Sequence, residues 1–356
     1  MPNAMEQPKP PTDPDTGIGA AAEEAAHAQH LARLFRHSLT AGEIHPLLHV
    51  MQRYRGVPGG VQLWPAAVPR PVPPVGPVPI NADVLRKRIV QLPSLPQAVL
   101  EVMKLLGDEE ASTADIADRI ERDQALTART LRIANSAFYG VPGRIGTIRT
   151  AIGILGLRTV GTLLTTAGVS AQFATDKCPE FQFGMFWRHA IATALMARGL
   201  AKPLRLDEDI AFTAGLLHDI GRLALAAQFP AETGQVLRHA HDLDLPVLEA
   251  ERRVLDVDHL AIGVLIATHW HFPDAVIAAI AHHHGPGAGT VATIADVIHV
   301  ADAFAHALDP SDNEDESVPS VESAAWARLE LSIPQCLAVL ASTSAGVAGL
   351  CEALAL

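Results

Sequence analysis

The residues with the clearest chemical potential are His218 and Asp219, which stand side by side in the apolar segment GLLHDIGRLAL. A buried imidazole next to a buried carboxylate is costly unless both groups are paired or bind a metal ion. The dipeptide alone is weak evidence, because His241 and Asp242 form the same pair in a charge-rich context where surface solvation accounts for them. The first pair is therefore a candidate for metal chemistry if further ligands accompany it.

Further ligand-type residues occur in the apolar segments on either side of this pair. They are His189, His259, His283, His284 and Asp302. Divalent first-row metals accept imidazole and carboxylate ligands, and ligands on several helices can converge in the core of a bundle. A metal ion held there would activate water and neutralise phosphate charge. The pattern predicts one polar pocket built from these residues together with His218 and Asp219.

The other histidines need a separate interpretation, because the chain contains 17 of them. A lone histidine is more often structural than a metal ligand. Several are therefore assigned to the surface or to helix caps, namely His269, His271, His282, His299 and His306.

The elements that must position the pocket are helices. Hydrophobic residues make up 49% of the chain and aromatic residues only 4%, a composition that favours close-packed helices. Ser112 with Asp115 forms a capping box, and Asp123 is a plausible cap for the next helix. Further helices are predicted at 186–201, 208–229, 232–241, 246–255, 259–270, 273–283, 291–307, 323–329 and 334–354. No segment shows the two-residue alternation of a strand, so the predicted class is all-α.

The chain divides by composition into successive parts. Residues 1–17 are rich in proline and polar residues and are expected to be disordered, whereas 18–57 carry a helical pattern. Residues 58–80 form a proline-rich linker, which we interpret as a semi-rigid spacer, with partner binding as the alternative. The main helical domain covers 82–308, an exposed acidic loop covers 309–320, and helices in 321–356 pack on the domain.

Charge, cysteines and hydropathy exclude several classes of protein. A formal net charge of -12 disfavours direct binding to nucleic acid. Three widely spaced cysteines suggest buried thiols in a reducing compartment, not a disulfide framework. The first residues lack the pattern of a secretory signal, and the apolar stretch 151–171 contains Arg158, so no membrane insertion and a cytoplasmic location are expected.

With these motifs in order along the chain, the sequence resembles the HD superfamily and, within it, the HDOD family. The resemblance runs from LPSLPQAVLEVMKLL through IERDQALTARTLRIANSAFYG, FWRHAIATA, AFTAGLLHDIGRL and DHLAIGVLIATHWHFP to IAHHHGP. It covers about residues 82–308, with one minor departure where Gln124 replaces the usual proline. The resemblance implies a multi-helix HD-related fold.

The resemblance also implies a ligand set. The metal ligands of the HD superfamily would fall on His189, His218, Asp219 and Asp302. The additional histidines of the related HD-GYP cyclic di-GMP phosphodiesterases would fall on His259, His283 and His284. A divalent transition metal, iron, manganese or zinc, is the implied cofactor.

Three departures count against phosphodiesterase activity. Met185 stands where HD-GYP proteins place a glutamate, and Gly285-Pro286-Gly287 replaces the GYP signature. The lysine expected after Asp302 is absent from AFAHALD. Arg222 keeps a positive charge where many HD enzymes have lysine, although it could equally be a surface residue.

Two functions remain open at this point. HDOD domains are generally regarded as regulatory modules, which implies a non-catalytic signalling scaffold whose partners would be proteins such as diguanylate cyclases, kinases or response regulators. The alternative is a metal-dependent phosphohydrolase or cyclic dinucleotide phosphodiesterase, with Asp219 as a metal ligand and Arg222 contacting phosphate. A metal or nucleotide sensor that binds without hydrolysis lies between them.

Overall fold

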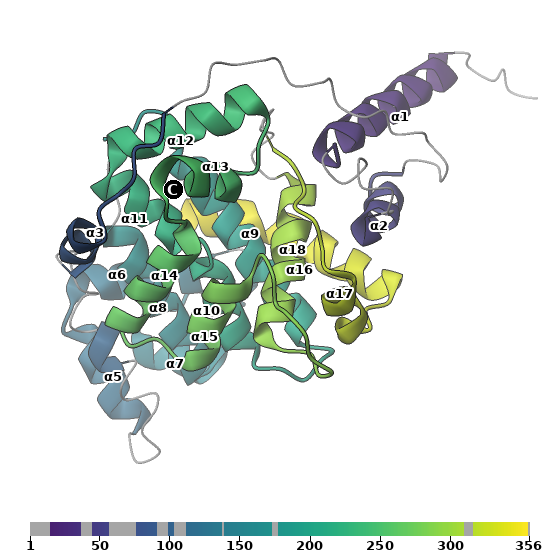
Figure 1. Ribbon diagram of the computed structural model, residues 1–356. Coiled ribbons are helices and arrows are strands. Elements are labelled where there is room, and N and C mark those ends of the chain that lie inside the picture. Colours follow the sequence, from purple (N-terminus) through teal and green to yellow (C-terminus); the bar gives the residue numbers. More distant parts are fainter. Residues whose placement is uncertain are drawn as a thin grey trace, which may run out of the picture.

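A computed structural model describes residues 15–36, 45–56, 76–90, 99–102, 112–136, 139–172, 177–309 and 316–354. These residues form helices joined by turns and loops, with no strand among them, which confirms the all-α class (Figure 1). The predicted disordered tail up to residue 14, the linker from 57 to 75 and residues 310–315 of the acidic loop lie outside the described residues.

The helices fall mostly within three residues of their predicted limits. Their bounds are α1 Asp15–Leu34, α2 Pro46–Tyr54, α3 Ala82–Val90, α5 Thr113–Glu121, α6 Gln124–Ala134, α7 Ile148–Leu155, α8 Leu157–Gln172, α9 Phe183–Ala201, α10 Glu208–Leu217, α11 Ile220–Gln228, α12 Pro230–Leu243, α13 Val247–Leu255, α14 His259–His269, α15 Asp274–His282, α16 Ile294–Leu308, α17 Ser323–Leu329 and α18 Ile333–Leu354. The Ser112–Asp115 capping box of α5 and the Asp123 cap of α6 are both present.

The prediction of one continuous helix over 208–229 is wrong, because the segment forms two helices. The chain breaks it into α10 and α11, and His218 and Asp219 form the junction. The Nδ1 atom of His218 lies 2.7 Å from the carbonyl oxygen of Gly215, so the imidazole turns back onto the end of α10. The apolar pattern runs through this junction without interruption, which is why periodicity alone predicts a continuous helix.

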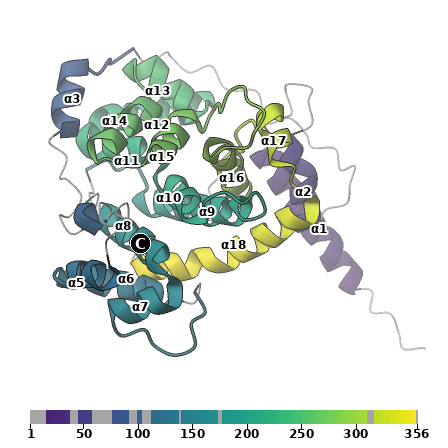
Figure 2. The same cartoon turned by 90° about the horizontal axis from the view of Figure 1, so that it is seen from below.

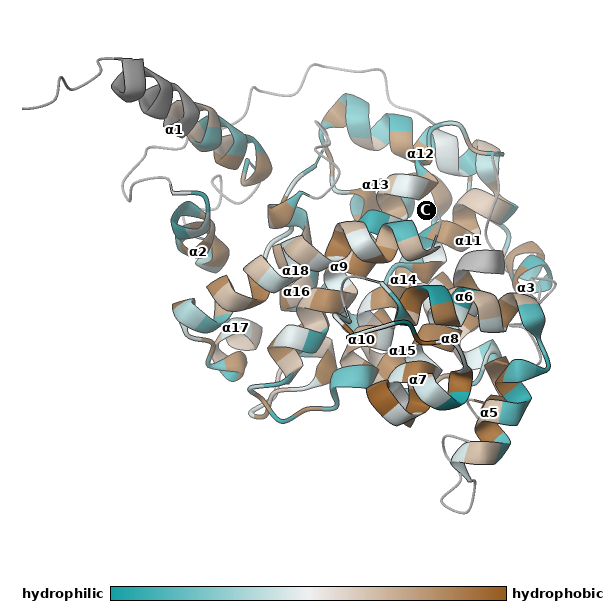
Figure 3. Ribbon diagram, turned by 180° about the vertical axis from the view of Figure 1, so that it is seen from behind, coloured by the Kyte–Doolittle hydropathy of each residue, from teal (hydrophilic) through white to brown (hydrophobic). Residues whose placement is uncertain are grey.

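The centre of the domain is α9, which is packed against α10, α16 and α18. Figure 2 shows α18 running beneath α9 and α10 towards the group formed by α5, α6, α7 and α8. Small residues allow the close approach of α9 and α10, because a Cβ added at Gly215 would lie 2.7 Å from the Cα of Ala194. Hydrophilic residues follow the outer helices α3 and α12 (Figure 3).

The N-terminal helices α1 and α2 dock on the domain, since both contact α16 and α2 also contacts α18. Nη2 of Arg33 donates to Oδ2 of Asp309 at 2.9 Å, and the Asp309 side chain is fully buried. The expectation that the acidic loop is exposed is therefore wrong at Asp309, and also at Val318, which is buried. The end of the predicted linker is also engaged, because the Val78 amide donates to the Val254 carbonyl at 2.7 Å.

Two segments are long and apolar enough to span a membrane by length and composition, Glu208–Gln228 and Ile333–Ala353. In the first, which contains α10 and α11, 78% of an 18-residue window is buried inside the protein, as is typical of core helices. The stretch 151–171 is divided between α7 and α8 by Gly156, whose φ of +85° favours glycine. The cysteines, Cys178, Cys336 and Cys351, are free and buried, as predicted.

Gly221 gives the first testable prediction, because it lets α11 approach α14. A Cβ added there would lie only 2.0 Å from the carbonyl oxygen of His259. We expect Gly221→Ala to lower the free energy of unfolding by about 3 kcal/mol, since backbone atoms must move to relieve the clash. Gly153→Ala, with open space around it on α7, is the control and should be neutral or slightly stabilising. Equal effects in denaturant unfolding would contradict the prediction.

Candidate metal centre

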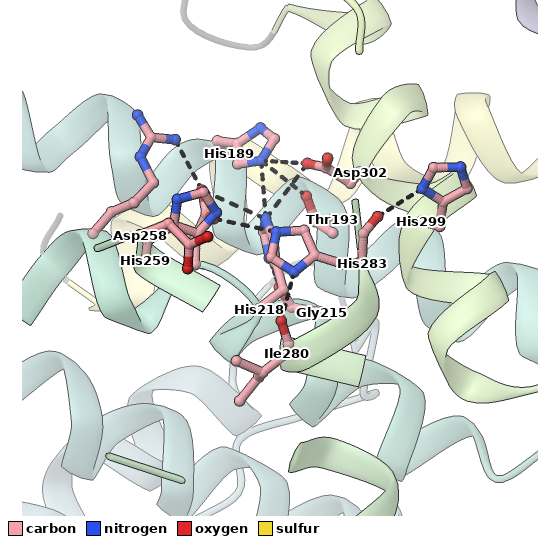
Figure 4. Close-up of polar contacts among 12 residues, drawn as sticks. His189, Thr193, Gly215, His218, Asp258, His259, Ile280, His283, His299 and Asp302 are labelled. Atoms are coloured by element: carbon pink, nitrogen blue, oxygen red, sulfur yellow. Dashed lines mark hydrogen bonds and ion pairs between the residues drawn. The ribbon is translucent and has the colours of Figure 1, made fainter. Parts of the chain in front are cut away.

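The candidate site lies where the helices of the central domain converge. His189 comes from α9, His218 and Asp219 from the α10–α11 junction, and Asp302 from α16. His259 begins α14, and His283 follows the last residue of α15. Figure 4 shows the imidazoles of His189, His218, His259 and His283 gathered in one polar cluster with Asp302. Six helices, α9, α10, α11, α14, α15 and α16, thus bring side chains to one place.

One half of the cluster surrounds the carboxylate of Asp302. Its Oδ1 atom lies 3.0 Å from Nε2 of His189 and 3.4 Å from Nε2 of His218. His306, one helical turn further along α16, brings its own Nε2 to 3.3 Å from the same oxygen. Three imidazole nitrogens therefore face a single carboxylate oxygen.

The other half surrounds Asp219, whose two oxygens have different neighbours. Oδ1 lies 3.3 Å from Nε2 of His259 and 3.5 Å from Nε2 of His283. Oδ2 accepts a hydrogen bond from Nη1 of Arg222 at 2.8 Å and lies 3.7 Å from Nε2 of His218. Asp219 therefore stands between the two halves, in the position of a carboxylate that two metal ions could share.

The imidazoles are fixed through their Nδ1 atoms. Nδ1 of His218 donates to the Gly215 carbonyl at 2.7 Å, and Nδ1 of His283 donates to the Ile280 carbonyl at 3.0 Å (Figure 4). A carbonyl oxygen can only accept, so the proton of each neutral ring is on Nδ1 and the lone pair is on Nε2. This is the tautomer and orientation that a metal-binding histidine needs.

Two other imidazoles are held by carboxylates instead. Oε2 of Glu251 lies 2.6 Å from Nδ1 of His259 and also accepts from the His259 backbone amide at 2.9 Å. Glu316 plays the same part for Nδ1 of His306. Carboxylate–histidine pairs of this kind orient metal ligands and raise their basicity.

A direct test of fit comes from the nitrogens that face the centre. Nε2 of His259 and Nε2 of His283 are buried and have no hydrogen-bond partner. A buried polar atom without a partner is costly, and a metal ion between these nitrogens and Asp219 would satisfy both. The residues therefore fit a divalent transition metal ion, and imidazole and carboxylate ligands suit several such metals.

The electrostatics keep the two carboxylates ionised, and although burial opposes it, the nearby carboxylates raise the pKa values of His218, His259 and His306. Burial alone would raise the pKa of Asp219, but the charges of His218 and Arg222 hold that pKa well below its usual range. The pKa of Asp302 is also held well below its usual range, with burial opposed chiefly by His306 and by hydrogen bonds from His189. Burial lowers the pKa of His283 and, more strongly, that of His284, so both rings are neutral near pH 7.

All seven predicted ligands belong to groups that could hold a metal ion. These groups are Asp219 with His259, His283 and His284; His189 with Asp302 and His306; and His189 with His218 and Asp219. The grouping of the predicted residues is thus found in the structure, whereas their role as metal ligands stays a prediction. His269, His271 and His282 are exposed, as expected, and so are His241 and Asp242.

Two histidines assigned to the surface are in fact part of the site or its support. His306 faces Asp302, and its side chain is only 19% exposed. His299 is buried; its Nδ1 donates to the His283 carbonyl at 2.6 Å, and its Nε2 accepts from the Glu322 amide at 2.9 Å. The spacing of His306, four residues after Asp302 on one helix, is the signal that could have found it.

Arg222 has a more defined role than the sequence indicates. It is neither a free surface residue nor an open phosphate contact, because its guanidinium is bound to Asp219. Burial opposes its charge, but the carboxylate of Asp219 raises the pKa of Arg222. Arg222 therefore stabilises the Asp219 carboxylate at Oδ2, whereas His259 and His283 face Oδ1.

The fold and the His/Asp cluster define an HD-type domain. A model of the HDOD domain matches residues 92–286, more than half of the chain, and the chain therefore belongs to the HDOD family. The match lies inside the predicted range 82–308.

Curated relatives match only in part. An uncharacterised protein of Treponema pallidum is 29% identical over 205 residues, which cover 57% of this chain and 39% of that protein. Ribonuclease Y of Lactobacillus acidophilus is 32% identical over 119 residues, 33% of this chain and 17% of that enzyme. The chain thus spans less than two fifths of either protein.

Two solved structures share the fold over most of their length. A Shewanella amazonensis protein provisionally named a phosphohydrolase has a TM-score of 0.63 and 25% identity, covering 76% of this chain and 98% of its own. An HDOD domain protein of unknown function from Geobacter sulfurreducens has a TM-score of 0.63 and 23% identity, and the match covers 76% of this chain and 97% of that protein. The second likeness concerns the fold alone.

Glu251 provides the prediction for this site. We expect Glu251→Gln to weaken binding of a divalent metal roughly ten- to hundredfold, because His259 loses the carboxylate that orients it and raises its basicity. Competition with a chromophoric chelator measures this affinity. Glu249→Gln, on the same helix with a side chain 46% exposed, is the matched control. Unchanged affinity in Glu251→Gln would contradict this role.

Proposed function

We propose that this chain is a signalling protein whose HDOD domain binds a pair of divalent transition-metal ions, with iron, manganese and zinc as the candidates. The observation that carries the proposal is the common orientation of four imidazoles. His218, His259, His283 and His306 each have Nδ1 bonded to an acceptor and Nε2 directed at Asp219 or Asp302. Such uniform orientation is typical of metal ligands.

In the proposed arrangement, His189, His218, Asp302 and His306 would hold one ion, and His259, His283 and His284 the other. Asp219 would contact both, because its oxygens face opposite halves of the cluster. Divalent ions there would supply Lewis-acid activation of water and neutralise phosphate charge. The protein's own contribution is to hold the carboxylates ionised and to limit solvent, since His218 and His283 have no exposed surface.

We propose that the domain acts through protein contacts, with metal binding as a structural or sensing function. Arg222 is bound to Asp219, so it is not available for phosphate in this conformation. Met185 and the missing lysine after Asp302 remove further groups that a phosphodiesterase would use. The partners would be signalling proteins, such as diguanylate cyclases, kinases or response regulators, in the cytoplasm and in pathways that include cyclic di-GMP.

A second candidate is a metal-dependent phosphohydrolase. The observation that favours it is the complete ligand set around Asp219 and Asp302, together with the likeness to the Shewanella amazonensis protein. The partial likeness to ribonuclease Y adds RNA to the phosphodiesters that an assay should include. The formal net charge of -12 disfavours RNA as the substrate, because it would repel the phosphate backbone.

Metal analysis beside a hydrolysis assay tests the proposal. We expect about two transition-metal ions per chain, no turnover of cyclic di-GMP or an RNA oligonucleotide, and loss of metal in Asp219→Asn. Asp242→Asn, which changes the exposed histidine–aspartate pair in the same way, is the control and should keep its metal. Metal-free protein would overturn the proposal, whereas turnover abolished by Asp219→Asn would establish the second candidate.

A further inference from the structure

Residues 316–322, here called the strap, lead into α17, and the first of them, Glu316, is bonded to His306 of the cluster. The strap is fixed by its own apolar residues, because Val318 is 1% and Val321 9% exposed. Its far end is held by His299, which accepts from the Glu322 amide at 2.9 Å and donates to the carbonyl of His283. The strap therefore has a defined position relative to the site.

The N-terminal helices hold the other edge of the strap. The Val318 amide donates to the Leu34 carbonyl at 2.7 Å, and Nε2 of His45 donates to the Pro319 carbonyl at 2.9 Å. His45 can donate from Nε2 because its Nδ1 accepts from the Leu47 amide. These bonds join segments more than 270 residues apart in the sequence.

Exposure differs among the side chains of the cluster, and the strap lies beside some of the more exposed ones. The side chains of His218, Asp219, His259, His283 and Asp302 are each 5% exposed or less. Those of His189, His306 and Glu316 are 11%, 19% and 17% exposed. An anion from water can therefore reach His189 and His306, and the carboxylate of Glu316 already lies beside His306.

Glu316 is a carboxylate surrounded by basic groups. It accepts a hydrogen bond from Nδ1 of His306. Burial would raise the pKa of Glu316, but His306, and after it His189 and Arg222, hold that pKa below its usual value. The same imidazole would attract a phosphate, because an imidazole N–H donor at hydrogen-bond distance suits either anion.

We propose that Glu316 is an internal competitor for anions, and that its carboxylate occupies a phosphate-binding position formed by His306 at the mouth of the cluster. This inference deepens the proposed function and rests on it, since it names how the same site would be regulated. A tethered carboxylate competes at high effective concentration. Phosphate can bind only to molecules in which Glu316 has left His306, so its apparent affinity is the intrinsic affinity multiplied by the fraction of such molecules.

Arg36 connects this competitor to the N-terminal helices. Its Nη1 donates to the carbonyl oxygen of Glu316, and its Nε donates to Oδ1 of Asp244 at 3.0 Å. The guanidinium thus fixes the backbone of Glu316 relative to the end of α12. A partner that moves α1 would loosen Glu316 and open the position to phosphate.

Calorimetric titration of the full chain with inorganic phosphate tests the inference. Glu316→Gln keeps the shape of the side chain and removes its charge, so we expect phosphate to bind about tenfold more tightly than to the wild-type chain. Glu322→Gln, an exposed residue at the other end of the strap, makes the same change in net charge and should have little effect. Equal affinities in the two variants, or weaker binding in Glu316→Gln, would overturn the inference.

A second variant guards against a change in folding. Arg36→Ala leaves the site intact and removes a positive charge, which by itself would weaken anion binding. Tighter phosphate binding in this variant can therefore come only from a loosened strap, and unchanged or weaker binding would contradict the role of Arg36. Denaturant unfolding of each variant shows whether the fold is retained.

The titrations are run on both metal-loaded and chelator-treated protein. Tighter binding by Glu316→Gln in the chelator-treated protein supports the competitor even if no metal is found, in which case only the proposed metal function fails. If metal is bound but Glu316→Gln and Glu322→Gln bind phosphate with equal affinity, the proposed metal function stands and the competitor is ruled out. The two ideas can thus fail separately.

Discussion

The burial of two carboxylates, Asp219 and Asp302, is the constraint on which the rest of the domain depends. They are 4% and 2% exposed in a core otherwise built from alanine, leucine, valine and isoleucine. Removing an ion from water costs several kcal/mol, so each carboxylate needs strong compensation close by. The imidazoles of the central helices and the guanidinium of Arg222 supply it. The proximity of so many basic groups, which would repel one another if all were charged, is then explained by the two carboxylates between them.

Glycines in the core allow the helices to approach closely enough for the basic groups to reach the buried carboxylates. Gly215 lets α10 lie against α9, and Gly221 lets α11 lie against the start of α14. With a side chain at either position the helices would separate, and the Nε2 atoms would lie too far from the carboxylate oxygens. The geometry of the cluster is thus set by backbone contacts some distance from the ligands, in a core whose dense packing transmits small shifts.

How far the sequence predicts this structure depends on the range of the interactions. Helix limits and the caps at Ser112 and Asp123 follow from residues within one turn, so they are predictable. The grouping of the seven predicted residues is also predictable, because these imidazoles and carboxylates stand in apolar segments, whereas the sequence assigns His306 to the surface. The break at His218 is not, since it depends on a side chain turning back onto Gly215 within a continuous apolar pattern. The burial of Asp309 and the place of Glu316 depend on Arg33 and Arg36, far away in the sequence.

The contact between the N-terminal helices and the domain decides how the strap could be controlled. Leu31, Leu34, Phe35, Leu47 and Met51 are completely buried there. At roughly 1.5–3 kcal/mol for each such side chain, their burial amounts to on the order of 10 kcal/mol, an upper limit because part of it is between α1 and α2 themselves. Spontaneous release is therefore rare, and a signal must come from a partner whose own apolar surface replaces these contacts. The ion pair of Arg33 with Asp309 adds little to the barrier, since both groups regain water when they separate. Apolar contacts thus keep the segment in place, while polar bonds through Arg36 and His45 set the position of the strap over the cluster.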